Sequence, residues 1–237
     1  MDPNATQTPI ACILDSADLK PVTAIAPGEL LSLFGEFSAG SPATPPPGQS
    51  PASLDGVTIG VNGLPSPLLY AGGEQINFQT PFGIAGGAQA NINFASAFLN
   101  LSDSRTLPIV ASNPTAFLNT AMPSAALATC TIESAASVNG LLPLALNQDG
   151  SANTCLNPAA AGSNVSLFLN GLGAASAPVV AANGLTVVSV TAPPDAISGV
   201  WQVNIRIPDG ASAGGNQISL AAGGIPVRDG NLVVWVN

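Results

Sequence analysis

The chain has 237 residues, of which 46% are hydrophobic and only 7% are charged, against about 25% charged residues in an average globular protein. Its 4 Lys and Arg, 13 Asp and Glu and no His give a formal net charge of −9. We therefore expect no nucleic-acid partner, because nucleic-acid binding requires a basic surface. An anionic membrane would also repel the chain, and no apolar run reaches the roughly 18 residues of a transmembrane helix, so we expect no membrane insertion.

The absence of histidine removes Ser-His-Asp and Cys-His catalysis and most zinc sites from consideration. The hydrophobic content is sufficient for a core in each of two domains and argues against disorder. With so few charges, the surface must consist of Ser, Thr, Asn, Gln, Gly and Ala. Such a surface repels a copy of itself weakly, which favours an extracellular or assembling protein over a cytosolic enzyme.

Taken in chain order, residues 1–11 form a polar arm with two prolines, which we expect to be flexible or to add as an edge strand. The first domain should span residues 12–112. The proline-rich segment 38–51 cannot join a central strand and predicts an exposed loop. Asn62-Gly63 predicts a hairpin turn. We expect strands in this domain at residues 30–34, 57–61, 64–70, 75–80, 88–94 and 97–101.

The segment Ser112-Asn113-Pro114 is the expected junction to a second domain spanning residues 113–237. The alanine-rich stretch 121–136 could form a short helix, although its proline and its Thr-Cys-Thr-Ile run favour irregular or extended chain. Turns are expected at 147–151 and 183–184. We expect strands in this domain at residues 141–146, 165–169, 179–190, 200–207, 217–221 and 232–236.

An internal repeat organises this pattern. The strand-turn sequence that starts at Gln75 has a near copy that starts at Gln202, 127 residues later. A second pair, which starts at Gly28 and at Gly162, is 134 residues apart, and the difference has the size of a loop insertion. Repeats of one β-unit, with short strands and a turn signal every 8–12 residues, predict an all-β fold of two tandem immunoglobulin-like antiparallel β-sandwich domains.

Several of these segments resemble a known family in the same order. They are Ala26-Pro27-Gly28-Glu29-Leu30-Leu31-Ser32-Leu33-Phe34-Gly35, residues 61–70, residues 75–81, Ala145-Leu146-Asn147-Gln148-Asp149-Gly150-Ser151 and residues 202–208. Over residues 12–237 the chain resembles the uncharacterised C-terminal domain of secreted Acidobacteria (Solibacter-type) proteins. The resemblance implies a bacterial, exported, β-rich module, often at the end of larger surface proteins, and implies no activity. The Asn-Gly-x-Pro segment is more weakly similar to immunoglobulin-like IPT/TIG domains.

The three cysteines are Cys12, Cys130 and Cys155. In an oxidising compartment Cys130 and Cys155 could close a loop of about 25 residues, which would stabilise the fold by roughly 3 kcal/mol. Cys12 would then remain as a buried thiol or form an intermolecular bond. Three buried thiols are the alternative.

The sequence signals for a catalytic, metal or sugar-binding site are weak. Acidic residues such as Asp15 and Glu29 lie in expected turns, so two carboxylates could serve a glycosidase only if the fold brings them together. The turn 147–151 resembles a calcium loop, but its glycine falls at the wrong position and no acid follows. Trp201, Trp235 and Tyr70 could stack on a sugar, although core packing suits them better. We expect no enzyme activity and no cofactor or metal.

The sequence thus predicts a secreted, non-enzymatic protein that self-associates through strand or edge contacts into an extracellular filament or surface assembly. Cys12 and the C-terminal strand residues Leu232, Val234 and Trp235 are the candidate assembly or binding positions. The expected partner is a copy of the same chain, in a homo-oligomer or homopolymer. The alternative is an adhesion module at the cell surface that binds a glycan or a surface protein.

Overall fold

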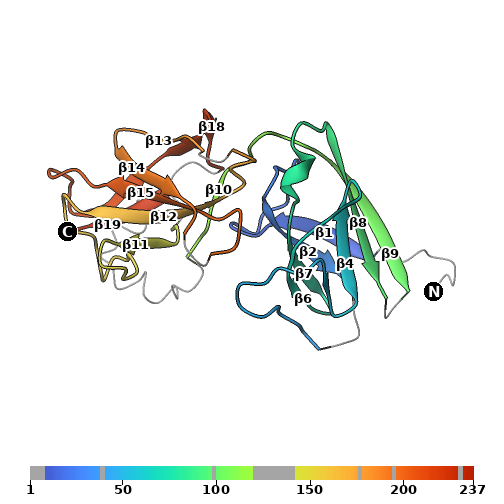
Figure 1. Ribbon diagram of the computed structural model, residues 1–237. Helices are drawn as coiled ribbons and strands as arrows, with labels where there is room; N and C mark the ends of the chain where they lie inside the picture. Colours follow the sequence, from blue (N-terminus) through green and yellow to red (C-terminus); the bar gives the residue numbers. More distant parts are fainter. Residues whose placement is uncertain are drawn as a thin grey trace. The chain divides into compact units, whose positions relative to one another are not determined.

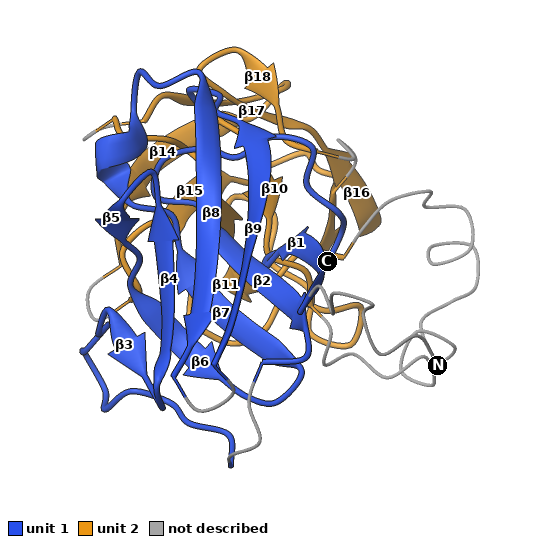
Figure 2. Ribbon diagram, turned by 90° about the vertical axis from the view of Figure 1, so that its right-hand side faces the viewer, with its two compact units in different colours: residues 1–111 blue, residues 112–237 orange. Residues whose placement is uncertain are grey.

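The computed structural model describes residues 9–37, 41–97, 100–119, 142–175, 178–193, 196–228 and 232–237. Over these residues the protein is all-β, with one short 3-10 turn at Phe82–Ile84 (Figure 1). The chain divides into two compact units, residues 1–111 and 112–237 (Figure 2). No helix in the described part of the chain is long and apolar enough to span a membrane.

Unit 1 is built from two antiparallel sheets with strand orders β1-β2-β7-β6 and β3-β4-β8-β9, and β5 pairs with β4. A parallel bridge from Ile25 to Ile109, just beyond the end of β9, ties the chain between β1 and β2 to the second sheet. The strands are β1 (Ile10–Asp15), β2 (Leu30–Gly35), β3 (Ser53–Leu54), β4 (Val57–Val61), β5 (Leu64–Pro65), β6 (Leu68–Ala71), β7 (Gln75–Gln79), β8 (Gln89–Ser96) and β9 (Leu101–Pro108).

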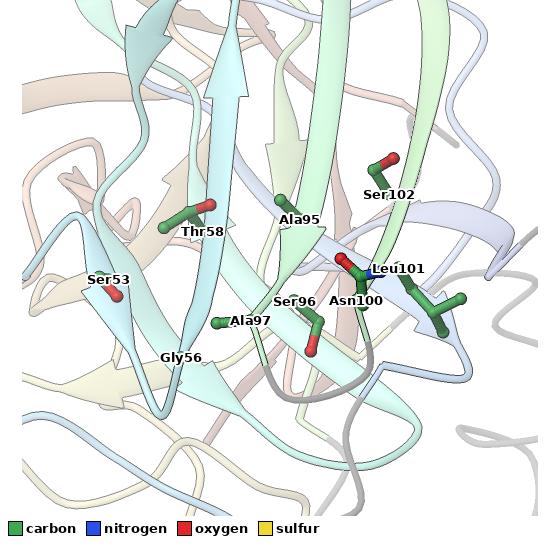
Figure 3. Close-up of a pocket in the computed structure, with 9 residues that line it drawn as sticks. All are labelled: Ser53, Gly56, Thr58, Ala95, Ser96, Ala97, Asn100, Leu101 and Ser102. Atoms are coloured by element: carbon green, nitrogen blue, oxygen red, sulfur yellow. The ribbon is translucent and has the colours of Figure 1, made fainter.

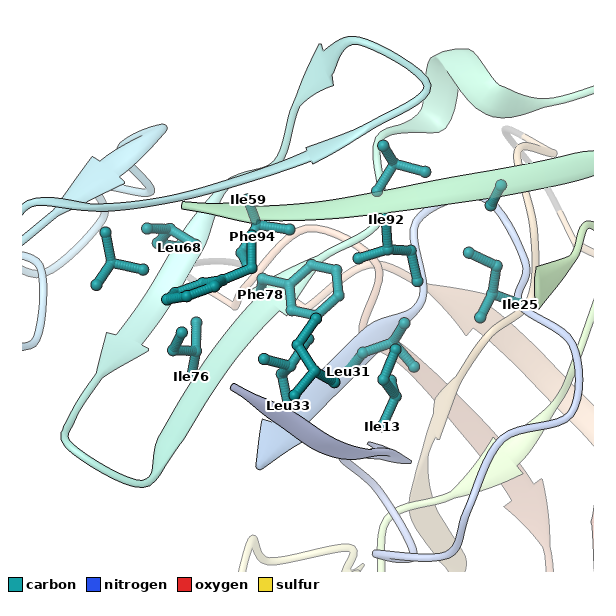
Figure 4. Close-up of a cluster of buried hydrophobic side chains, with 14 of the residues drawn as sticks. Ile13, Ile25, Leu31, Leu33, Ile59, Leu68, Ile76, Phe78, Ile92 and Phe94 are labelled. Atoms are coloured by element: carbon teal, nitrogen blue, oxygen red, sulfur yellow. The ribbon is translucent and has the colours of Figure 1, made fainter. Parts of the chain in front are cut away.

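The core of unit 1 is formed by side chains that alternate between buried and exposed positions along the strands. Along β8 every second side chain is buried, so Ala90, Ile92 and Phe94 point inward while the residues between them face solvent. These inward side chains meet those of β2 and β7 in one buried cluster (Figure 4). Phe94 contacts Phe37 with ring centroids 5.0 Å apart at 59°, a tilted arrangement that aromatic pairs favour.

Unit 2 is also built from antiparallel strand pairings. Its largest sheet has the order β10-β12-β15-β14, with β11 also paired to β12, and its remaining strands form the pairings β13-β17-β18 and β16-β19. The strands are β10 (Thr115–Ala116), β11 (Ala145–Asn147), β12 (Asn164–Asn170), β13 (Val180–Ala182), β14 (Thr186–Thr191), β15 (Trp201–Arg206), β16 (Gly214–Ile218), β17 (Leu220–Ala222), β18 (Ile225–Pro226) and β19 (Leu232–Val236). A second buried cluster fills the interior of this unit.

The register of the central strand pair is the same in both units. In unit 1, β2 pairs with β7 so that Leu31 lies opposite Phe78. In unit 2, β12 pairs with β15 so that Val165 lies opposite Ile205. Both Phe78 and Ile205 are fully buried, and they occupy equivalent places. The 134- and 127-residue offsets seen in the sequence therefore hold for the pairing of these strands.

The irregular features repeat as well. Between β6 and β7 the register shifts between Leu68 and Tyr70, and between β14 and β15 it shifts at the equivalent place, between Val187 and Ser189. The parallel bridge between Ile25 and Ile109 in unit 1 has an equivalent in unit 2, a parallel bridge between Ala159 and Val236. A β-bulge and a sheet-switching bridge at matching positions indicate that one unit was duplicated with its irregularities, because neither is required by hydrophobic alternation.

The first strand differs between the units. In unit 1, β1 runs continuously along β2. In unit 2 the matching edge of β12 is shared by two short pieces, β10 and β11, which are far apart in sequence. The two ends of the chain between β10 and β11 lie side by side. Leu118 forms an antiparallel bridge with Pro143, and the amide of Leu144 donates to the carbonyl of Phe117. Unit 2 therefore carries an insertion within its first strand.

Several expected elements need correction. The strand expected at 97–101 is wrong, and the structure has β9 at Leu101–Pro108 instead. Its inward positions include Asp103 and Arg105, so the apolar alternation that marks the other strands is missing. The return strand expected at 64–70 is split into β5 and β6 around Ser66 and Pro67. The arm expected over residues 1–11 ends earlier, because β1 begins at Ile10. The alanine-rich stretch 121–136 and Cys130 lie outside the described residues.

Candidate interaction surfaces

The buried acidic side chains are engaged in turns. The Asp15 carboxylate accepts the amide of Ala17 at 2.7 Å, and that of Glu29 accepts the amide of Ala26 at 2.5 Å. Both residues are fully buried, and each stabilises a turn that leads out of or into a strand. No group of three or more His, Cys, Asp or Glu side chains that could hold a metal occurs among the described residues.

The turn that resembles a calcium loop is held by its own hydrogen bonds. Gly150 has a φ of +82°, and its amide donates to the carbonyl of Asn147. The Asp149 carboxylate accepts both the hydroxyl and the amide of Ser151, at 2.6 and 3.0 Å, and these bonds lower the pKa of Asp149. The carboxylate that a cation would need is therefore used to close the turn.

One ion pair occupies the outer edge of β9 in unit 1. Asp103 and Arg105 lie 2.8 Å apart. Asp103 accepts the amides of Ser104 and Ile10, and Arg105 donates to the carbonyls of the same two residues. Burial raises the pKa of Asp103, but these hydrogen bonds and the Arg105 charge outweigh it, so the pKa lies below its ordinary value. Charged side chains of this kind protect an edge strand from pairing with another chain.

The edge strand β6 is also covered. Ala43, in the proline-rich segment, exchanges two backbone hydrogen bonds with Ala71, at 2.8 and 3.0 Å, and the amide of Leu68 donates to the carbonyl of Pro51. The expected proline-rich loop therefore has a structural effect, because its backbone pairs with an edge that would otherwise be open.

No described residue gives such cover to the equivalent strand in unit 2, β14. It is the end strand of its sheet, and no backbone hydrogen bond from another described residue reaches its outer edge. Its sequence, Thr186-Val187-Val188-Ser189-Val190-Thr191, contains no charge and no proline, and Val188 at the bulge is 52% exposed. The chain between β12 and β13 is too short to supply a loop like that of unit 1.

The candidate assembly residues from the sequence lie in different settings. Cys12 is exposed on β1 and is the one free cysteine in the described part of the chain. Leu232, Val234 and Trp235 are at most 4% exposed, since β19 pairs with β16 along its length and packs inside unit 2. In this conformation those three side chains hold the fold of unit 2 together and present no surface. Sequence reasoning missed β14, whose signal was an uncharged run of Val and Thr without proline.

The aromatic residues do not form a stacking surface. Trp235 is buried, and Trp201 is partly buried against the core of unit 2. Tyr70 is partly buried on β6. In the described part of the chain, sugar binding by a row of exposed Trp or Tyr rings is therefore not available.

A different surface of unit 1 is exposed, flat and uncharged. The outward side chains of β4, β8 and β9 line up across the strands in rows, such as Thr58–Ala95–Ser102. At the end of this face, where β8 leads into β9, lies a hollow of about 390 Å³ that is lined by outward residues and by the inward Ser96 and Leu101 (Figure 3). Among the described residues, its lining consists of Ser53, Gly56, Thr58, Ala95, Ser96, Ala97, Asn100, Leu101 and Ser102, none of which is charged or aromatic.

Comparisons with known proteins add little to this geometry. No family model matches the chain, and no curated protein matches it. Among solved structures, a similar chain is an endo-fucoidan hydrolase from glycoside hydrolase family 107, at 12% identity, with 90% of this chain and 27% of that chain covered. The TM-score is 0.25, which is too low to carry an argument about fold or activity.

Proposed function

We propose that the chain is a secreted, non-enzymatic structural protein of two tandem immunoglobulin-like β-sandwiches, and that copies of it associate through β14 into an extracellular filament or surface assembly. The observation that carries this proposal is the edge of β14, which is uncharged and on whose outer side no other described residue donates or accepts a backbone hydrogen bond. The low content of charged residues and the resemblance to secreted Acidobacteria modules support export.

The strand order supports the immunoglobulin-like assignment. The order β1-β2-β7-β6 in one sheet and β4-β8-β9 in the other corresponds to the A-B-E-D and C-F-G sheets of that fold. In unit 2, β10 and β11 stand for the first strand, followed by β12, β15 and β14. On this assignment β14 is the D strand, an edge strand in immunoglobulin domains.

An open edge can bind an extended segment, because its unpaired amides and carbonyls form main-chain hydrogen bonds with any added strand. The edges of β1 and β6 are contacted by other parts of the chain, and the edge of β9 carries the Asp103–Arg105 ion pair. We therefore propose the N-terminal segment of a second copy, residues 1–8, as the strand that adds to β14. Such a head-to-tail contact generates an open filament when the rotation between successive copies does not close a ring, and a filament is the form that we propose.

The test compares two lysine substitutions in unit 2. Val188→Lys places a charge on the β14 bulge, while Val179→Lys introduces the same change at a residue that is 75% exposed and precedes β13. We expect the wild-type protein and Val179→Lys to form filaments visible by electron microscopy, and Val188→Lys to remain monomeric in size-exclusion chromatography. Deletion of residues 2–8 should also give monomers.

A wild-type protein that stays monomeric at high concentration would refute the proposal. So would filaments that form equally well from Val188→Lys. A closed dimer that survives deletion of residues 2–8 but not Val188→Lys would instead indicate pairing between two β14 strands, and would exclude the filament.

The cysteines fit the same proposal. We propose that Cys130 and Cys155 are paired within the chain, which leaves the exposed Cys12 for a bond between copies. Peptide mapping of the assembled material under non-reducing conditions should yield a peptide that links Cys130 to Cys155. A link from Cys12 to either of the other two within one chain would contradict this pairing.

A further inference from the structure

We propose that the outward face of β4, β8 and β9 in unit 1 binds a neutral polysaccharide, with one sugar unit seated in the hollow at the β8–β9 end. This function is separate from assembly through β14, since it uses the other unit.

The first argument is the chemistry of the face. Its exposed positions on β8 are Gln89, Asn91, Asn93 and Ala95, and those on β9 are Ser102, Ser104, Thr106 and Pro108. Amide and hydroxyl groups that both donate and accept hydrogen bonds match the hydroxyls of a sugar. The two charged residues of β9 point away from this face and are paired with each other, so an anionic ligand meets no cation here.

The second argument is the shape of the face. Three residues in the row nearest the hollow, Thr58, Ala95 and Ser102, have small side chains, which leave room for a ligand above the strands. A volume of about 390 Å³ lies within the range of small-ligand sites, which is about 300–1,000 Å³. The regular spacing of the rows along the strands lets a polymer contact several rows in succession.

The third argument is an unpartnered hydroxyl. Ser96 is 3% exposed, lines the hollow and has no hydrogen-bond partner for its Oγ among the described residues. Figure 3 shows Ser96 between Ala97 and Asn100 where the strand ends. A buried hydroxyl without a partner is costly, so a bound hydroxyl group that supplies the missing hydrogen bond would gain affinity at this point.

The experiment is isothermal titration of the full chain with neutral cello-, xylo-, manno- and chito-oligosaccharides and with an anionic oligogalacturonate. Ala95→Arg fills the hollow from an exposed strand position, and Ser102→Arg does so from the neighbouring strand. Gln217→Arg is the matched control, an exposed strand position in unit 2. Thermal unfolding of each variant verifies that it is folded.

We expect at least one neutral oligosaccharide to bind and the anionic one not to bind. Ala95→Arg and Ser102→Arg should each weaken binding at least tenfold, while Gln217→Arg leaves it unchanged. The proposal is overturned if no neutral oligosaccharide binds, if only the anionic one binds, or if both folded arginine variants bind as the wild type does. Since no β14 residue is changed, failure here does not bear on assembly.

Discussion

At the scale of single residues, the two units differ in how the backbone amide at one equivalent position is satisfied. Pro108 and Trp235 occupy equivalent positions, because the carbonyl of each accepts the amide of the bridging residue, Ile25 or Ala159. Pro108 has no amide that needs a partner. Trp235 has one, and the buried Asn153 side chain accepts it at 2.8 Å and donates to the carbonyl of Trp235 at 2.9 Å.

The position equivalent to Asn153 in unit 1 is Val22, since the amides of both donate to the first strand of their unit. The two equivalent positions thus hold Val22 and Pro108 in unit 1, and Asn153 and Trp235 in unit 2. Asn153 is needed where Trp235 has a backbone amide to satisfy, and is not needed where Pro108 has none, because a buried amide that loses its hydrogen-bond partner costs about 1–3 kcal/mol.

We predict that Asn153→Val lowers the free energy of unfolding by about 1–3 kcal/mol, because it leaves the Trp235 amide and Oδ1 of Asn147 without their partner. Asn157→Ala, at an exposed position in the same turn, is the control and should cost less. Urea unfolding followed by fluorescence measures both. An Asn153→Val protein as stable as the wild type would show that the hydrogen bond contributes nothing.

At the scale of elements, the same strand pair tolerates different surroundings in the two units. The Gln-x-Asn pattern of β7 and β15 has a local cause, since Gln75 donates to Asn77 at 2.7 Å and Gln202 to Asn204 at 2.9 Å. In unit 2, Asn204 also contacts Ser166 and Ser189 on the two neighbouring strands. In unit 2 these hydrogen bonds link three neighbouring strands, and in both units the bond from Gln to Asn accounts for the motif without a ligand.

The insertion in the first strand of unit 2 allows an element-scale prediction. Deletion of residues 118–143 should join Phe117 to Leu144 and restore a continuous strand like β1, because these two residues already share a backbone hydrogen bond. We expect cooperative thermal unfolding and an unchanged β-type circular dichroism spectrum, measured in a reducing buffer since the deletion removes Cys130. Loss of cooperative unfolding would mean that the insertion belongs to the core of unit 2.

At the scale of the whole molecule, the chain consists of two units with separate cores. Each core is closed by the parallel bridge of its own unit, Ile25–Ile109 or Ala159–Val236. In the described ranges, each strand pairs only within its own unit. A unit that contains its own core and all of its strand partners has what a domain needs in order to fold alone.

We predict that residues 1–111 and 112–237, produced separately, each unfold cooperatively on heating. The proposals also divide between them. Residues 1–111 should retain oligosaccharide binding, and residues 112–237 should bind a peptide of residues 1–8 but not polymerise. If either piece is unfolded by circular dichroism while the full chain is folded, the two units depend on each other for stability.

The sequence by itself determined the all-β class, most strand positions and the repeat, because alternation, glycine turns and the two matching motifs are local signals. It could not locate β9, whose inward Asp103 and Arg105 break the alternation and are explained only by the edge that they protect. Nor could it distinguish the roles of two hydrophobic strands. Leu232–Val236 appeared available for assembly but is buried, while the open edge belongs to Thr186–Thr191. Whether a strand is central, covered or open depends on which distant segments pair with it, and only the tertiary structure decides that.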